Sequence, residues 1–360
     1  MQLKPFNQKK KESLPGYSKF TAATPAYVTG YREIGGRFVP TVSTRLSLRD
    51  RLADWGVRWD IGRGNYRVES GLYAVGDPQS ESPLLVTANY KLSFDRLRTE
   101  LGGLDAWIVV LDTKGVNVWC AAGKGSFGTG ELLDKIGRLR LADIVSHRKL
   151  ILPQLGAPGI SAPDIARVTP FRVVWGPVRA ADIPAFLAAG MKKTDSMRRV
   201  EFRFADRMAV APVELAQAWP FMLGALGLSF LGALPLASGF AHRLAWLLGG
   251  TLGSILVGSL AFPALLPLLP PKAFSVKGAV LGLLWGLACA FVGALGWAMG
   301  TALVLASTAT VSFIALNFTG ASTYTCQSGA NLEVEKSILP IIASLVIGLG
   351  LGGAARIFGF

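Results

Sequence analysis

The stretch WIVVLDTKGVNVWCAAGKGSFGTG, residues 107–130, decides the fold of the region around Cys120. An apolar run ends at Leu111, a polar turn covers residues 112–115, and Cys120 precedes four glycines in a short space. A strand that leads into a glycine-rich loop is typical of α/β domains, whose ligands bind beyond the carboxyl ends of the strands. The phosphate-binding P-loop is excluded, because Gly123 and Lys124 are followed by Gly125 and not by Ser or Thr.

The sequence on both sides of this stretch alternates between short apolar runs and helix-forming segments. Strands are expected over residues 66–75, 84–88, 106–111, 150–152 and 171–175, and helices over 94–101, 130–139 and 183–189. This alternation predicts an α/β, Rossmann-like domain with a largely parallel sheet. The loops 87–91, 112–130, 153–159 and 175–179 then follow the carboxyl ends of strands and are the expected ligand-binding region.

Charge divides the chain near residue 213. Of its 37 basic and 23 acidic residues, only five basic and three acidic ones follow residue 213, which leaves 32 and 20 before it. We therefore expect an irregular lead-in over residues 1–60 with one short helix near 46–55, an α/β domain over 61–213, and a nearly uncharged all-α domain over 214–360. The basic N-terminus is not followed by the apolar run of a signal peptide, which favours a cytoplasmic α/β domain.

The uncharged part contains five long apolar segments, at residues 216–236, 244–262, 279–299, 301–317 and 338–355. Each approaches the ~20 residues that cross a bilayer, so a transmembrane domain of five helices in the cytoplasmic membrane is expected. Four arginines (198, 199, 203 and 207) precede the first segment and indicate its cytoplasmic end. Residues 318–337 are expected to form a cytoplasmic loop. The basic charge comes without a nucleic-acid motif, so we expect contact with the lipid bilayer and no nucleic-acid partner.

The three cysteines, Cys120, Cys289 and Cys326, are too widely spaced for a zinc motif and too few for an iron–sulfur cluster with four thiolate ligands. A cysteine hydrolase needs a histidine base. Of the two histidines, His242 is expected at a membrane boundary on the opposite face, and no third residue that would orient His147 is evident. We interpret His147 as a hydrogen-bonded structural residue. Cys120 then has two readings left: a small buried residue, or a soft thiolate ligand for a polarizable metal centre.

Several runs resemble one family. NVWCAAGK at 117–124 with GSFGTGEL at 125–132 is similar to the corrinoid-binding signature of the mercury-methylating corrinoid proteins, relatives of the corrinoid iron–sulfur protein of the acetyl-CoA pathway. VTANYKLSFDRLR (86–98), SHRKLILPQLGAPGI (146–160), VVWGPVRAADIPAFL (173–187) and NFTGASTYTCQSG (317–329) resemble further blocks of that family, in the same order. The resemblance covers roughly residues 60–360, and Cys326 stands where most members have Ser.

The resemblance implies a corrinoid cofactor whose cobalt is coordinated by Cys120 from the lower face, on a short cap helix. The other implied corrinoid-binding residues are Asn117, Val118, Trp119, Ala121, Ala122, Gly123 and Lys124 in the cap, Thr87, Ala88 and Asn89 at a strand end, and Pro153, Gln154 and Gly156, with 175–177 as a further weak candidate. Val118 and Trp119 have an alternative role in packing the cap, and Asn89 has one as a turn former.

The resemblance also implies a function: a corrinoid-dependent methyltransferase that passes a methyl group from methyl-Co(III) to inorganic Hg(II) and makes methylmercury. A ferredoxin-like iron–sulfur protein would supply electrons, and a methyl-donor protein or a methylated folate would supply the methyl group. The alternative is a membrane-anchored corrinoid carrier that delivers methyl groups to another acceptor in one-carbon metabolism.

Overall fold

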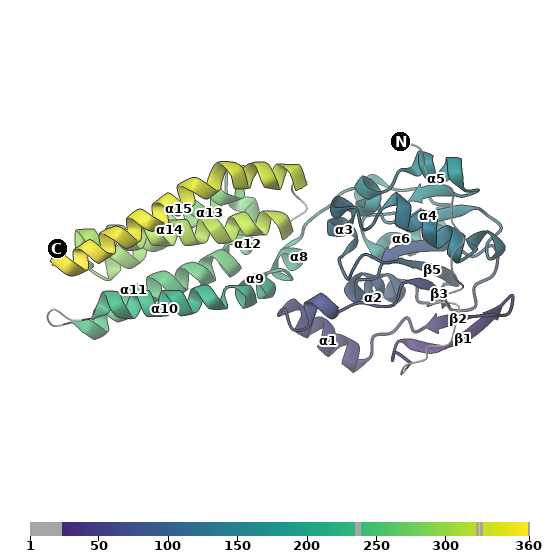
Figure 1. Ribbon diagram of the computed structural model, residues 1–360, viewed down its shortest axis with the longest axis horizontal. Helices are drawn as coiled ribbons and strands as arrows, with labels where there is room; N and C mark the ends of the chain where they lie inside the picture. The colour runs from purple at the N-terminus through teal and green to yellow at the C-terminus, as the bar shows by residue number, and fades with distance from the viewer. Residues whose placement is uncertain (1–23, 235–238, 322–323, 325–326, 359–360) are drawn as a thin grey trace. The chain divides into compact units, whose positions relative to one another are not determined.

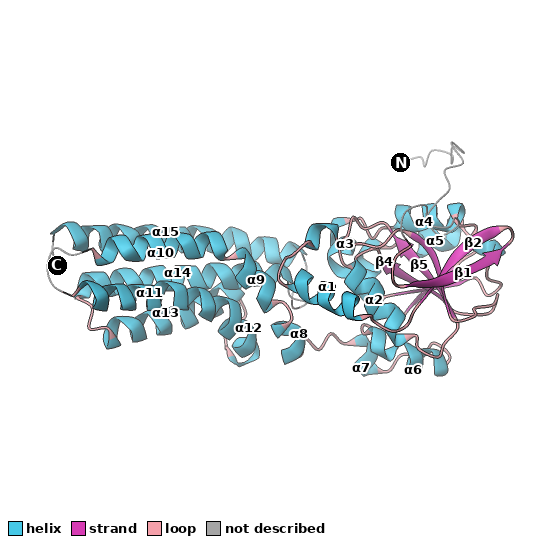
Figure 2. Cartoon of the chain, turned by 90° about the horizontal axis from the view of Figure 1, so that it is seen from below, coloured by secondary structure: helices cyan, strands magenta, loops and turns pink. Residues whose placement is uncertain are grey.

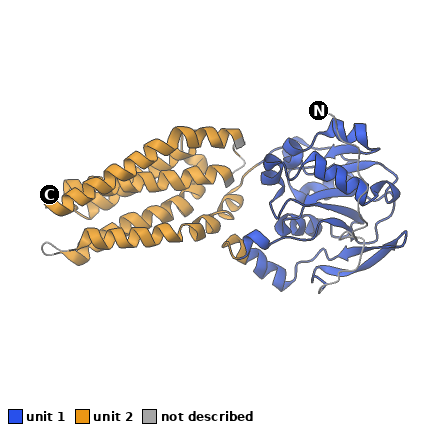
Figure 3. Ribbon diagram, in the orientation of Figure 1, with its two compact units in different colours: residues 1–55, 62–200 blue, residues 56–61, 201–360 orange. Residues whose placement is uncertain are grey.

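The structure of the protein is a computed structural model that describes residues 24–234, 239–321, 324 and 327–358 (Figure 1). The chain separates into two compact units: residues 1–55 with 62–200, and residues 56–61 with 201–360 (Figure 3). Within the described residues, the strands lie in the first unit and the second unit is helical.

A seven-stranded mixed sheet forms the centre of the first unit, in the order β1-β2-β3-β5-β4-β6-β7. The strands are β1 (Val28–Ile34), β2 (Arg37–Val42), β3 (Gly71–Val75), β4 (Leu84–Ala88), β5 (Ala106–Leu111), β6 (Lys149–Leu152) and β7 (Arg172–Trp175). All five strands expected from the apolar runs are present. β3 begins later than expected and runs antiparallel to β5, while β5, β4, β6 and β7 run parallel to one another. Only residues 76–83 join β3 to β4, fewer than the dozen or more that a parallel crossover needs.

The expectation of an irregular lead-in over residues 1–60 is wrong for its described part. β1 and β2 form an antiparallel hairpin, and β2 joins β3 in parallel. Gly35 and Gly36 make the turn with φ of 55° and 75°, the left-handed conformation that a two-residue hairpin turn requires. The expected short helix is confirmed as α1 (Leu48–Arg58). The Gly-Gly pair indicates a hairpin turn, but the Pro, Gly and Arg residues around it are more typical of a loop.

Helices cover both faces of the sheet (Figure 2). One core contains alternate strand residues such as Val86 and Val109 with side chains from α3 (Val118–Lys124), α4 (Thr129–Arg138) and α5 (Ala162–Val168). The other contains Leu85 and Ile108 with side chains from α2 (Lys91–Glu100), α6 (Ile183–Ala188) and α7 (Asp195–Arg198). Short 3-10 turns lie at Arg63–Asn65, Leu141–Asp143, Gln154–Gly159 and Ala180–Asp182. Since β4 to β7 are parallel, the four loops expected to bind a ligand leave the sheet at one edge.

The second unit consists of apolar helices. They are α8 (Phe204–Met208), α9 (Ala211–Gln217), α10 (Trp219–Ala233), α11 (Phe240–Leu256), which continues as a π-helical turn at Val257–Ala261, α12 (Phe262–Leu265), a 3-10 turn at Leu266–Leu268, α13 (Phe274–Val292), α14 (Trp297–Ala321) and α15 (Gln327–Phe358). Four helices of the described chain are long and apolar enough to cross a membrane, or five if the bent pair 204–217 and 219–233 makes one span. Five spans therefore stay a prediction.

Helices α13 and α14 pack through glycines spaced four residues apart on α13. A Cβ added to Gly282 would lie 2.5 Å from the carbonyl oxygen of Ser307, and one added to Gly286 would lie 2.8 Å from the Cα of Val304. Small residues at this spacing permit the close backbone approach typical of helices that associate in lipid.

The prediction of a loop over residues 318–337 is wrong for most of that range. α14 continues to Ala321 and α15 already begins at Gln327, and Cys326 lies outside the described residues. Polar residues suggested a loop here, but they form hydrogen bonds between helices: the Glu333 carboxylate accepts hydrogen bonds from the backbone N–H and the hydroxyl of Ser275, at 2.7 and 3.0 Å.

Candidate cofactor-binding site

Cys120 lies in the first turn of α3, the short helix expected at this point. Oδ1 of Asn117 accepts a 2.9 Å hydrogen bond from the backbone N–H of Cys120, which is the N-cap interaction that begins a helix. Gly125 ends the helix in the left-handed region, with φ of 81°. Cys120 is half-buried, whereas Ala121 and Ala122 belong to the core below. The helix is therefore fixed at both ends and along its inner face, with the cysteine partly accessible.

The other residues of the expected cap share this arrangement. Asn117, Val118 and Trp119 are half-buried, and Gly123 and Lys124 are exposed. Val118 packs against the core of the sheet, which supports the packing role that was considered for it.

The segment Gln154–Gly159, which follows β6, packs against α3 through glycines. A Cβ on Gly156 would lie 2.5 Å from Cε1 of the buried Phe127, and one on Gly159 would meet the backbone of Phe127 and Ala122. The structure thus brings the expected Pro153–Gly156 region and the cysteine helix together. Gly156 itself is a packing residue, because the ring of Phe127 fills the space beside it.

Asn89 organises the loop that leads from β5 to α3. Its Oδ1 accepts hydrogen bonds from the backbone N–H groups of Thr113 and Gly115, at 3.1 and 2.9 Å, and its Nδ2 donates to Oδ1 of Asp112 at 3.0 Å. Asn89 is only 3% exposed, and Thr87 and Ala88 before it are buried as well. The turn-forming role considered for Asn89 is confirmed, and contact between these three residues and a corrinoid stays a prediction.

Asp112 is the charged centre of the same loop. Burial works against its ionisation, but hydrogen bonds and positive charge from Lys114, together with the hydrogen bond from Asn89, lower the pKa of Asp112 overall. Its backbone N–H donates to Oε1 of Glu131 on α4 at 2.8 Å. The loop before Cys120 is therefore tied to β4 on one side and to α4 on the other.

Lys193 is a residue near the site that the sequence did not indicate. Its Nζ donates to Oε1 of Gln154 at 2.7 Å and to the carbonyl oxygen of Gly176 at 3.3 Å, so it connects the loops after β6 and β7. Burial and the neighbouring charge of Arg198 lower the pKa of Lys193. No motif or spacing marks this lysine, because its partners lie far away in the sequence.

His147 is a structural histidine, as expected. Its Nδ1 accepts from the backbone N–H of Lys149 at 3.0 Å, and its Nε2 lies 2.9 Å from the carbonyl oxygen of Ser82. Ser82 precedes β4, whereas Cys120 follows β5, and the two strands are parallel, so the histidine lies at the opposite edge of the sheet. This geometry excludes a Cys120–His147 catalytic dyad.

The surroundings of Cys120 fit a metal whose other ligands are mostly supplied by a cofactor. Among the residues that the structure describes, no group of three or more His, Cys, Asp or Glu residues could enclose a bare metal ion. A single soft sulfur on a capped helix can supply one ligand to a metal held in a macrocycle. A cavity of about 480 Å³ opens beside Thr41 and Asp105, but it contains none of the expected site residues.

The α/β domain is similar in sequence to subunits of known enzyme complexes. Residues 62–187 match the family of the CO dehydrogenase/acetyl-CoA synthase delta subunit. The chain is 35% identical over 123 residues to the gamma subunit of the acetyl-CoA decarbonylase/synthase complex of Methanopyrus kandleri, and 31% identical over 151 residues to that of Archaeoglobus fulgidus. These alignments cover 33% and 41% of this chain, but only 26% and 30% of the relatives.

The similarity therefore concerns the α/β domain and leaves most of each relative unmatched. It confirms the expected relationship to the corrinoid proteins of the acetyl-CoA pathway, and it agrees with a corrinoid as the cofactor. This similarity does not extend to mercury methylation. In its α/β domain, this chain is similar to the gamma subunits of acetyl-CoA decarbonylase/synthase complexes.

Proposed function

We propose that this chain is a membrane-anchored corrinoid-dependent methyltransferase in which Cys120 is the protein ligand to cobalt, and that its methyl acceptor is Hg(II). The observation that carries the proposal is the position of Cys120, half-buried on a short capped helix at the edge of the sheet from which the ligand-binding loops leave. The similarity to mercury-methylating corrinoid proteins, in five sequence blocks, supports Hg(II) as the substrate.

The chain's own residues would hold and tune the cofactor. A bound corrinoid supplies the methyl-transfer chemistry, while the protein controls its orientation and electronics. The sulfur of Cys120 would donate electron density to the metal, and the Asn117 cap would keep that sulfur at a fixed point of the helix. Asn89 would act indirectly, because its hydrogen bonds hold the loop that leads to the cap helix.

The helical unit would anchor the protein in the cytoplasmic membrane with the α/β domain in the cytoplasm. Its long apolar helices, four or five by length and composition, support this proposal. A multi-pass anchor predicts that the protein stays in the membrane pellet after washing with alkaline carbonate, and that a label confined to the periplasm does not reach residues of the α/β domain. Release by carbonate, or labelling of that domain in intact cells, would contradict it.

A ferredoxin-like protein would deliver electrons, because three cysteines cannot supply the four ligands of an iron–sulfur cluster. The methyl group would come from a methyl-donor protein or a methylated folate.

The test of the ligand is Cys120→Ala, with Cys289→Ala as the matched control. Cys289 is a buried cysteine of α13 in the helical unit, and its replacement should leave the cofactor unchanged. Purified Cys120→Ala protein should show a shifted corrinoid absorbance spectrum and should form no methylmercury from Hg(II), reductant and added ferredoxin. Full turnover by the Cys120→Ala variant would refute the proposal, and so would wild-type protein that shows no corrinoid absorbance.

A methyl-group carrier for another acceptor is the second candidate. It is favoured by the relatives, which are subunits of acetyl-CoA decarbonylase/synthase complexes. The two candidates separate when methylated protein receives Hg(II) in one reaction and alternative acceptor proteins in another. Methyl transfer to an acceptor protein without methylmercury formation identifies the carrier.

A further inference from the structure

Helix α1 exposes an apolar face. Leu48, Leu52 and Trp55, at spacings of four and three residues, occupy one side of the helix and are 74%, 61% and 62% exposed. An amphipathic helix on a water-soluble domain normally turns such a face toward the core. α1 does the reverse, so its orientation must be imposed by its polar side.

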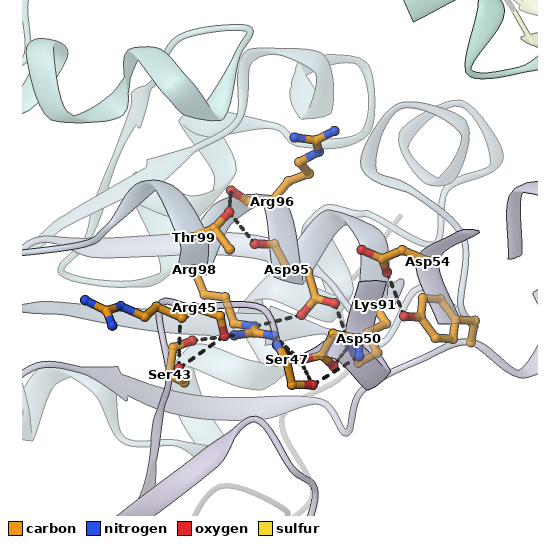
Figure 4. Close-up of polar contacts among 11 residues, drawn as sticks. Ser43, Arg45, Ser47, Asp50, Asp54, Lys91, Asp95, Arg96, Arg98 and Thr99 are labelled. Atoms are coloured by element: carbon orange, nitrogen blue, oxygen red, sulfur yellow. Dashed lines mark hydrogen bonds and ion pairs between the residues drawn. The ribbon is translucent and has the colours of Figure 1, made fainter. Parts of the chain in front are cut away.

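A network of charges holds the polar side of α1 inward (Figure 4). Asp50 accepts hydrogen bonds from Nζ of Lys91 at 2.7 Å and from Nη2 of Arg98 at 3.3 Å, and Arg98 is completely buried. One turn later, the hydroxyl of Tyr66 donates to Asp54 at 2.7 Å. Turning the apolar face inward would break these contacts and leave buried charges unpaired, which costs several kcal/mol in proteins.

The start of α1 is fixed as well. The Ser47 hydroxyl accepts from the backbone N–H of Asp50, and the Asp50 carboxylate accepts from the backbone N–H of Ser47, both at 3.1 Å. This reciprocal pair is a capping box. The apolar face is thus presented outward by a rigid support on its other side.

The charges beside this face indicate what it contacts. Arg45, Arg49 and Arg51 are exposed on the same segment. Apolar residues with Trp on one side of a helix and arginines beside them are typical of helices that lie in the interface of an anionic bilayer.

The residues at the end of α1 group with the helical unit and support the same environment. Nη1 of Arg58 donates to the carbonyl oxygen of Ala209 at 3.3 Å, and Nε2 of Gln217 donates to Asp60 at 3.2 Å. Ala209 lies between α8 and α9, and Gln217 is the last residue of α9, just before α10, the first of the long apolar helices. These hydrogen bonds lie within the helical unit, so the last residues of α1 belong to the same unit as the apolar helices.

We propose that α1 is an interfacial helix: Leu48, Leu52 and Trp55 lie among the headgroups and outer acyl carbons of an anionic bilayer, and Arg45, Arg49 and Arg51 contact lipid phosphates. This inference rests on the membrane anchoring proposed above. It adds a second, peripheral membrane contact made by the cofactor-binding domain itself.

The test uses the full chain in nanodiscs that contain spin-labelled lipid. In a background of Cys120→Ala, Cys289→Ala and Cys326→Ser, one cysteine is introduced by Leu52→Cys and labelled with an environment-sensitive fluorophore. Val168→Cys is the matched control, because Val168 is an apolar residue, 54% exposed, on α5. The label at 52 should be quenched several-fold more strongly by shallow spin labels than the label at 168. The difference should grow with the fraction of anionic lipid and decrease at high salt.

Two results would overturn the proposal. One is a label at 52 that is as open to water as the label at 168. The other is a label at 52 that is shielded from water but not quenched by lipid, which would mean that protein covers the face, such as residues 1–23 or a second copy of the chain. Carbonate extraction separates this failure from that of the anchor: extracted protein refutes the spans, whereas retained protein with an unquenched label refutes only the interfacial helix.

Discussion

Replacing Asn89 with Ala should loosen the loop that carries Cys120 without touching the cysteine. The substitution removes the acceptor of the backbone N–H groups of Thr113 and Gly115 and the donor to Asp112, all at 2.9–3.1 Å. Thr113 is fully buried, so water does not replace the lost acceptor at that residue. Each buried group left without a partner costs about 1–3 kcal/mol, so we expect a loss of about 3 kcal/mol.

The assay is thermal unfolding of the purified full-length protein, followed by near-ultraviolet circular dichroism, with and without corrinoid. A loss of about 3 kcal/mol corresponds to a fall of about 6–12 °C in the melting temperature of a domain of this size. The control is Asn65→Ala, at an exposed asparagine that should change the melting temperature little. Asn89→Asp keeps an acceptor but places a second carboxylate beside Asp112, so its loss should be intermediate and larger at neutral than at acidic pH. A melting temperature of Asn89→Ala within about 2 °C of wild type would refute this account of the loop.

Three further predictions concern packing and charge. Burial opposes ionisation of Asp50, but hydrogen bonds from Lys91 and Ser47 lower its pKa from 3.8 to about 2. The ionised carboxylate therefore stabilises the fold fully above about pH 4 and loses this effect as the pH falls toward about 2. Asp50→Asn should cost about 2 kcal/mol in urea unfolding at neutral pH, and its difference from wild type should shrink over that acidic window. Gly282→Leu should destabilise the helical unit by more than about 2 kcal/mol in detergent, because its Cβ meets the backbone of α14, whereas Gly224→Leu on α10 meets open space and should be tolerated. Gly156→Ala should cost about 1–3 kcal/mol through its clash with Phe127, whereas Gly130→Ala in α4 should be neutral or slightly stabilising; equal effects of the two would contradict the packing of the loop after β6 on α3.

The sequence predicted the parts of the fold that depend on local patterns. Fully buried strands such as β4 and β5 consist almost entirely of apolar residues between turn signals, so their position and bounds could be read directly. The antiparallel direction of β3 and the hairpin before it were not predicted, because they depend on loop lengths and on one Gly-Gly turn.

The candidate site divides in the same way. The cysteine, the glycines and the cap helix form one continuous stretch, and the sequence indicated them together. The contacts of Asn89 with residues 112–115 and of Lys193 with Gln154 join segments more than 20 residues apart, and no spacing rule marks them. The helical residues 327–337 were expected as loop because their Ser, Asn and Glu side chains resemble a solvated segment, although Glu333 is used in contacts between helices.

The position of β1 and β2 determines how the α/β domain can be cut out of the chain. The family match begins at residue 62, whereas the first strand of the sheet and Asp50, the partner of Arg98, come earlier in the chain. A fragment that starts at residue 62 would leave the edge of β3 without β2 and would remove Asp50 from the buried Arg98. Exposed strand edges promote aggregation, so such a fragment should be insoluble. Expression of the cofactor-binding domain alone should therefore start before Val28.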